Sequence, residues 1–242
     1  MLTAQFVLVT AGIFLAGTVS GATGMAFPLI AGPIFLFAFD PVEAVALTAL
    51  CSLTGQLFSI ALLRRGIAYQ FRAMLIMPGL CAVPLGTMLL AHCSHDVVRG
   101  TLGSLIVLSG IWGFTQAPSQ ARARPGWLCE FLVGVTGGIT GGLVGASAVA
   151  PAIWSSWQGL SKESQRAILQ PYILTMQCFS LVSLAILGEF TREIPGHYAA
   201  VLAPLLLGVA SGVACFRMVS SDSMTRTVLS LVTVSGIALL LR

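Results

Sequence analysis

The chain has 242 residues, of which 57% are hydrophobic and only 8% are charged, and its formal net charge is +4. Soluble domains carry about 25% charged residues, so this composition excludes a soluble globular protein and favours an integral membrane protein. The apolar runs are continuous rather than alternating, which predicts membrane-spanning helices. The positive charge is then a signal of membrane topology and does not indicate nucleic-acid binding.

Long apolar segments predict five helices in each half of the chain. They cover about 4–20, 22–39, 44–63, 73–91 and 98–115, then about 127–143, 146–160, 165–187, 198–217 and 225–241. We therefore expect an all-α integral membrane protein with a single transmembrane domain. Its two homologous five-segment halves are an N-terminal repeat at 1–118 and a C-terminal repeat at 126–242.

The first two predicted segments contain no charged side chain before Asp40. As one straight helix this stretch would span about 55 Å, well beyond the hydrocarbon thickness of about 30 Å. It must turn back, and the breakers available are Gly17, Gly21, Gly24 and Pro28.

The corresponding stretch of the second half, between Glu130 and Lys162, is shorter than the roughly 40 residues that two crossings need. We expect the opening segments of both halves to be tilted, broken or partly re-entrant. Their tips should be buried, because free backbone groups at membrane depth need protein or a water-filled cavity.

Motifs of the first half recur in the second. Gly17, Gly21 and Gly24 return as Gly138, Gly142 and Gly145, a shift of 121 positions (17 to 138), and the same shift carries the segment 54–59 onto 175–180. Duplicated membrane proteins with broken segments at equivalent places in both halves are typical of solute transporters.

Basic residues predict the orientation. With ten crossings, one side holds Arg64, Arg65, Arg72, Arg122, Arg124, Lys162, Arg166, Arg217 and Arg226, and the other holds Arg99, Arg192 and Arg242. The positive-inside rule places the larger group in the cytoplasm. We expect a multi-pass protein of the cell inner (plasma) membrane with both termini periplasmic. Five crossings per half make the repeats inverted, whereas four crossings would make them parallel, and the uneven charge favours inversion.

The glycine-rich breaks allow two interpretations. G-x-x-x-G spacing, as in Gly17–Gly21 and Gly138–Gly142, is typical of close helix packing. A helix broken at mid-membrane also exposes N–H groups and a dipole that attract an anion. Both roles can coexist.

Gln56 and Gln177 occupy equivalent positions in the third helix of each half, accompanied by Thr54 and Thr175. A buried glutamine amide needs a partner. The pair either bridges helices as polar contacts or lines a pseudo-symmetric site that offers N–H donors to an oxyanion.

No Asp, Glu, Lys or Arg is expected deep inside a predicted helix, which predicts an anion site built from neutral dipoles. Asp40 and Glu43 are expected to cap a helix start. Glu130, Glu189 and the three histidines, His92, His95 and His197, are expected to be solvated boundary residues. The six cysteines form no C-x-x-C pair, so we expect no metal site, no disulfide and no cofactor.

A remote alternative is an intramembrane serine protease. The sequence Gly145-Ala146-Ser147-Ala148 resembles the serine motif of rhomboid-type proteases, with His197 as the base to be tested. His197 follows Pro195-Gly196 at a predicted loop edge, which is too shallow for that role, and we expect no enzymatic activity.

The run from Gly17 through Gly24 to Pro28 resembles the signature that opens the sulfite exporter TauE/SafE family. The stretch from Gly134 through Gly145 to Pro151 resembles the internal repeat of that family. The similarity covers nearly the whole chain. It implies an inner-membrane permease for sulfur-containing oxyanions or small organosulfonates.

We therefore expect a permease for a small anion, most favourably sulfite or an organosulfonate, that works by alternating access at the repeat interface. The alternative is a permease for another small metabolite or ion. The expected partners are the lipid bilayer and the small anionic substrate. A homo-oligomer is a further alternative. The expected substrate-binding residues are Gly21, Thr23, Gly24, Met25, Thr54, Gln56, Gly142, Gly145, Ser147, Thr175 and Gln177.

Overall fold

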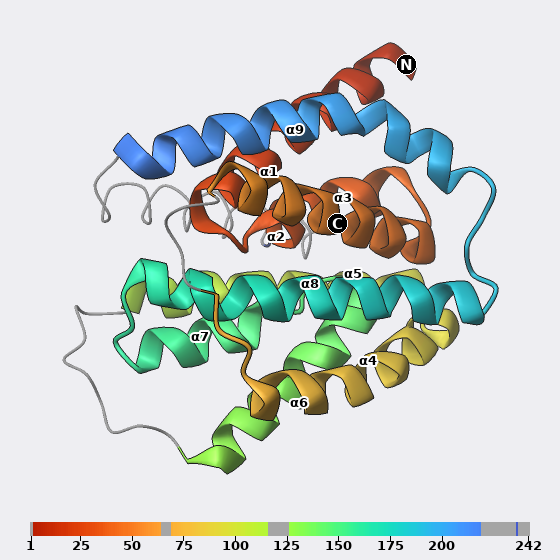
Figure 1. Ribbon diagram of the computed structural model, residues 1–242. Helices are drawn as coiled ribbons and strands as arrows, with labels where there is room; N and C mark the ends of the chain where they lie inside the picture. The colour runs from red at the N-terminus through yellow and green to blue at the C-terminus, as the bar shows by residue number, and fades with distance from the viewer. Residues whose placement is uncertain (1, 64–68, 116–125, 219–235, 237–242) are drawn as a thin grey trace.

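A computed structural model describes residues 2–63, 69–115, 126–218 and 236. This part of the chain is all helical (Figure 1). Its helices are α1 (Leu2–Thr23), α2 (Phe27–Ala38), α3 (Pro41–Leu62), α4 (Ala73–His92), α5 (His95–Thr115), α6 (Trp127–Val144), α7 (Val149–Trp157), α8 (Lys162–Ile186) and α9 (Ile194–Met218).

The predicted elements and the observed ones agree closely. Nine predicted helices are present within a few residues of their expected bounds, and the tenth, at 225–241, lies outside the described residues except for Gly236. In the described part, α3, α4, α6, α8 and α9 are long and apolar enough to cross a membrane. The expected all-α multi-pass membrane protein is therefore confirmed.

The opening segments of each half are broken, as expected. A long helix, α1 or α6, is followed by a short one, α2 with 12 residues or α7 with 9. At 1.5 Å per residue these short helices measure about 18 and 14 Å, roughly half of the hydrocarbon thickness. Neither α2 nor α7 can cross a bilayer by itself.

Two glycines make the breaks. Gly24 and Gly145 adopt φ values of 82° and 72°, in the left-handed region that favours glycine. After α6, the N–H of Ala146 donates to the carbonyl of Thr140 at 3.2 Å, in the manner of a Schellman cap. After α1, the hydroxyl of Thr23 plays the corresponding role. It accepts hydrogen bonds from the N–H of Met25 at 3.4 Å and from the N–H of Ala26 at 3.3 Å.

The other repeated glycines let helices touch backbone to backbone. A methyl group built on Gly21 would overlap the carbonyl of Val209 in α9, and one built on Gly142 would overlap the carbonyl of Val83 in α4. Gly17 and Gly138 make the same kind of approach to α9 and α4. The packing interpretation of these glycines is therefore confirmed.

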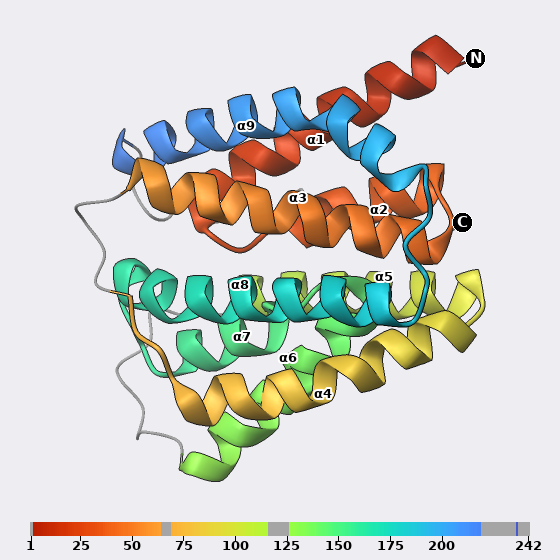
Figure 2. The same ribbon diagram turned by 45° about the vertical axis from the view of Figure 1, so that its right-hand side comes forward.

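The two closely packed pairs join the sequence halves. α1 packs against α9 and runs parallel to it, and α6 packs against α4 and runs parallel to it, as the order of facing glycines shows. Figures 1 and 2 show two layers, one with α1, α2, α3 and α9 and the other with α4, α6, α7 and α8. At the centre, α3 of one layer lies against α8 of the other.

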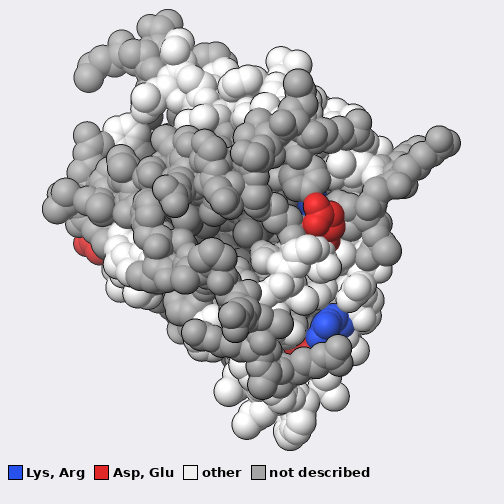
Figure 3. Space-filling view, turned by 90° about the vertical axis from the view of Figure 1, so that its left-hand side faces the viewer, with Lys and Arg blue, Asp and Glu red and all other residues white. Residues whose placement is uncertain are grey.

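The described part of the surface carries few charged side chains. Figure 3 views the end of the molecule at which α4 and α6 begin, and the described residues there are mostly uncharged, with a few acidic and basic side chains among them. Ile186 and Leu207, exposed over 80% and 64% of their surface, belong to a large set of exposed apolar side chains on the helices. Such an apolar exterior fits contact with lipid.

The glycine packing predicts a position-specific effect of one methyl group. Gly138→Ala should lower the thermal stability of the detergent-purified protein, because the new Cβ meets the backbone of Gly79. Gly100→Ala is the matched control, since nothing lies within 4 Å of a Cβ built there. It should be neutral or stabilising by up to about 1 kcal/mol from helix propensity. Equal melting temperatures for the two variants would contradict this packing.

Candidate functional site

Residues of both helix breaks contact one apolar cluster. Met25, from the first break, packs against an apolar cluster that contains Ala148 of the second break together with Leu169 and Ile173 of α8. The segments that interrupt the two halves therefore both lie beside α8, at different depths along it. Elements far apart in the sequence form a single candidate site there.

A glutamine holds each break. Gln56 of α3 donates from Nε2 to the carbonyl of Gly24 at 2.5 Å, and Gln177 of α8 donates from Nε2 to the carbonyl of Gly145 at 2.9 Å. Both side chains are buried, with 2% and 0% exposed. The equivalence seen in the sequence is thus an equivalence of contacts, because each amide reaches the left-handed glycine of its own half.

These contacts have a clear physical purpose. The carbonyl that follows the last helical turn has no intrahelical partner, and an unsatisfied carbonyl at membrane depth costs several kcal/mol. Gln56 and Gln177 supply the missing donors. One N–H of each amide, which we expected to face an oxyanion, is therefore used on the protein's own backbone, and the bridging interpretation of the pair describes what is seen.

The burial of Arg166 is a feature that the sequence did not predict. The loop-charge rule assigns Arg166 to the cytoplasmic side, and the residue lies near the start of α8 with only 2% of its surface exposed. Its Nη2 donates to the carbonyl of Gly21 at 3.1 Å and to the hydroxyl of Ser59 at 2.5 Å. A buried cation therefore lies beside the first break, whereas the sequence predicts a site of neutral dipoles.

The guanidinium lies directly against the first break. A Cβ built on Gly24 would stand 3.2 Å from both Cγ and Nε of Arg166. The loop residue Tyr69 is also within its electrostatic reach. Burial raises the pKa of the Tyr69 hydroxyl, and the positive charge of Arg166 opposes that shift. The cation thus contacts the first break and lies within electrostatic range of Tyr69.

Periodicity along α8 could have revealed this arginine. Residues 166, 170, 173, 177 and 180 follow a spacing of three and four, which places them on one face of a helix. Four of these five are polar, namely Arg166, Gln170, Gln177 and Ser180, and all four are at most 2% exposed. A polar stripe of this kind in a membrane helix faces protein rather than lipid.

Gln170 extends the network at the first break. Its Nε2 donates to Oε1 of Gln56 at 2.8 Å, and its side chain is fully buried. Sequence reasoning did not single out Gln170, because it has no polar counterpart in the first half. The shift of 121 that relates Gln56 to Gln177 relates Gln170 to Ala49 and Arg166 to Val45.

The site is therefore asymmetric. Both breaks have a glutamine, but among the described residues only the first has a cation and a second amide. At the second break the methyl group of Thr48 lies against Gly145. Thr48 and Gln56 are eight residues apart on α3, about 12 Å along the helix axis. The charged break and the uncharged break thus lie at different depths along the bundle.

The other predicted site residues have varied places. Thr54 shares a 2.6 Å hydrogen bond with the hydroxyl of Tyr198 in α9, and Thr175 donates to the carbonyl of Pro171 in its own helix. Neither contact involves a break. Ser147 is fully buried in the second break, and its hydroxyl has no hydrogen-bond partner among the described residues.

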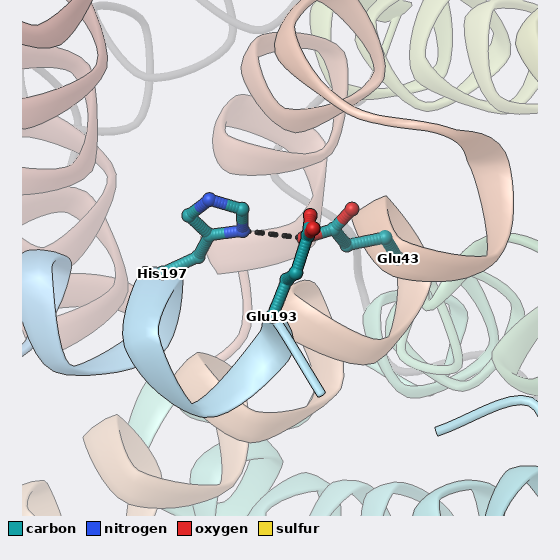
Figure 4. Close-up of side chains that lie close together, drawn as sticks. All are labelled: Glu43, Glu193 and His197. Carbon is teal, nitrogen blue, oxygen red and sulfur yellow. Dashed lines mark hydrogen bonds and ion pairs between the residues drawn. The ribbon is translucent and has the colours of Figure 1, made fainter. Parts of the chain in front are cut away.

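A second group of polar side chains lies away from the breaks. Nδ1 of His197, at the start of α9, shares a 2.5 Å hydrogen bond with Glu43 in the first turn of α3, and Glu193 is beside them (Figure 4). The carboxylate and ring atoms lie within 4.8 Å of one another. Glu43 thus pairs with a histidine, and Asp40, at the N-cap of α3, makes no side-chain capping bond.

This pairing bears on the protease alternative. A serine nucleophile needs a base within hydrogen-bonding distance. His197 instead pairs with Glu43, and it belongs to a cluster that does not include Ser147. In the described part of the chain, no histidine is hydrogen-bonded to Ser147.

Comparison with known proteins adds one match. The model of the family described as sulfite exporter TauE/SafE matches residues 9–239 of the chain. No curated protein and no solved structure matches it.

Removing either glutamine bridge should destabilise the fold. Gln56→Leu and Gln177→Leu each leave a buried carbonyl without its donor, which costs about 1–3 kcal/mol. We expect lower melting temperatures in detergent for both variants. Thr175→Val is the control, because its hydroxyl bonds within α8 and should matter little. If the glutamine variants melt together with the control, the bridges do not hold the breaks.

Proposed function

The chain belongs to the sulfite exporter TauE/SafE family, a family of membrane transporters, and from that premise we propose that it is a permease for small anions. Sulfite or organosulfonates are the substrates that we favour. The observation that carries the proposal is the buried Arg166 beside the broken end of α1. A cation inside a membrane bundle favours an anionic ligand and opposes a cationic one.

The ends of the helices at the breaks also favour an anionic ligand. The negative ends of the α1 and α6 dipoles are covered by Gln56 and Gln177, and Arg166 adds a full positive charge at the first. The positive ends of α2 and α7 begin immediately after the breaks. The local potential is then set by the helix starts and the guanidinium, both of which attract an anion.

We propose that the substrate binds between the breaks, with its anionic group toward Arg166. Of the residues expected from the sequence, Gly24, Met25, Gly145 and Ser147 are the ones that form the breaks. Gln56 and Gln177 shape the site by holding the backbone in place. Thr23 supports the first break, Gly21 and Gly142 position α1 and α6, and Thr54 and Thr175 lie farther along α3 and α8.

Transport follows from the duplicated plan. We propose that residues 1–118 and 126–242 are inverted repeats, and that rocking of one layer against the other exposes the site alternately to each side. Support comes from α3 and α8, which are counterparts in the two halves. They run antiparallel, because Gln56 meets Gln170 while the later residue Ser59 meets the earlier residue Arg166.

We place the protein in the cell inner membrane with both termini periplasmic, on the basis of its loop charges. In that orientation Arg166 lies toward the cytoplasmic end of α8. An anion moving through the bundle would therefore meet the charged break on the cytoplasmic side and the uncharged break on the periplasmic side.

The test is anion flux in proteoliposomes. Arg166→Gln should reduce sulfite flux by about tenfold to hundredfold, because hydrogen bonds to a charged group contribute roughly 1.5–3 kcal/mol. Arg166→Lys keeps the charge and should retain more flux. Arg99→Gln is the control, since Arg99 pairs with the exposed Asp96 on α5, and it should transport as the parent does.

Size-exclusion chromatography of each variant separates loss of transport from loss of fold. Folded Arg166→Gln protein with undiminished sulfite and organosulfonate flux would refute the assigned site. Absence of anion flux from the parent protein would refute the anion permease itself.

A further inference from the structure

The hydrogen bonds at the first break fix the orientation of two amides. The carbonyl of Gly24 can only accept, so Gln56 must present Nε2 to it. Oε1 of Gln56 then faces Gln170, which must present its own Nε2. We call this chain of hydrogen bonds, from Gln170 through Gln56 to the carbonyl of Gly24, the relay. The carbonyl sets the direction of both bonds, because flipping either amide would place two acceptors or two donors face to face.

The relay ends in an acceptor that has no donor. Because Nε2 of Gln170 faces Gln56, Oε1 of Gln170 points elsewhere, and it has no hydrogen-bond partner in the described part of the chain. The side chain is fully buried. A buried amide oxygen that lacks a donor is costly in an apolar interior, so this oxygen is suited to a group that arrives with the substrate.

We propose that Oε1 of Gln170 accepts a hydrogen bond from a transported organosulfonate, which makes the permease prefer sulfonates that carry a hydroxyl or ammonium donor. This inference rests on the proposed anion permease and adds to it a second point of recognition. Arg166 takes the anionic group, and Gln170 takes the donor of the same molecule.

The placement of the two residues suits one small ligand. Arg166 and Gln170 are one turn apart on the same face of α8, where side chains four residues apart are neighbours. Both contact the first break, Arg166 through Gly24 and Gln170 through Gln56. In a molecule whose sulfonate group and hydrogen-bond donor are separated by two carbon atoms, the two polar groups lie at opposite ends. One end can then face Arg166 while the other faces Gln170.

Gln177 provides a comparison within the same protein. It is as deeply buried as Gln170, and its Oε1 also lacks a partner among the described residues. Gln177 lies at the second break. In the first half of the sequence, the positions equivalent to Arg166 and Gln170 are occupied by Val45 and Ala49. If any buried amide sufficed for selectivity, Gln177 would serve as well as Gln170, but only Gln170 has a cation one turn away.

The experiment compares matched sulfonates in proteoliposomes. Isethionate and propanesulfonate have the same size, and differ in a hydroxyl that propanesulfonate replaces with a methyl group. Taurine supplies an ammonium donor instead. We expect the parent protein to prefer isethionate and taurine over propanesulfonate by about tenfold to hundredfold in flux at low concentration, the factor that an unpaired buried acceptor implies.

Gln170→Met, which keeps the length of the side chain and removes the acceptor, should abolish this preference. Gln177→Met should lower flux for all three sulfonates and leave their ratio unchanged. Because the measurement is a ratio, a general loss of folded protein does not imitate the effect. Gln170→Leu also removes the acceptor without adding a charge, and should abolish the preference if Gln170→Met does not fold.

The outcomes separate the two proposals. Equal flux of isethionate and propanesulfonate in the parent would overturn the role of Gln170 while leaving an anion permease, and a resident water on Oε1 would give that result. A preference that survives Gln170→Met, or that is lost in Gln177→Met alone, would also overturn it. No flux of any sulfonate or of sulfite would reject the permease on which the inference rests.

Discussion

Backbone carbonyl groups cannot be left without donors inside a membrane, and the centre of this protein is arranged around that constraint. The chain breaks at Gly24 and Gly145, and each break leaves a carbonyl that the preceding helix cannot satisfy. Gln56 and Gln177 satisfy them from α3 and α8. These two helices must therefore lie beside the breaks, and their contact forms the middle of the molecule.

The remaining structure brings the breaks to this place and differentiates them. Glycine contacts bind α1 to α9 and α6 to α4, so each layer contains helices from both halves. The two breaks have equivalent positions in the two halves of the sequence, and Arg166 and Gln170 stand where the first half has Val45 and Ala49. In the permease that we propose, the first break would bind the anion and the second would complete the symmetry needed for rocking.

The length and charge of the opening segments predicted the breaks. The charge-free stretch before Asp40 is too long for one crossing, and the equivalent stretch of the second half is too short for two full crossings, so both must turn within the membrane. Repetition predicted that Gln56 and Gln177 share a role. Arg166 was missed because a rule for loop charges counts residues near helix ends without asking which face they occupy. The pairing of α1 with α9 depends on tertiary packing, which glycine spacing permits but does not assign to a partner.

The most direct test of a shared, hydrated site at the breaks is thiol accessibility in the membrane. Met25→Cys and Ala148→Cys would be made in a protein whose six native cysteines are replaced, with Leu57→Cys as a control on the exposed side of α3. We expect a charged, water-soluble thiol reagent to modify both break positions, isethionate to slow that modification, and Leu57→Cys to react only with a lipid-soluble reagent. Break positions that behave like Leu57→Cys, unprotected by any anion, would contradict a binding site between the two breaks.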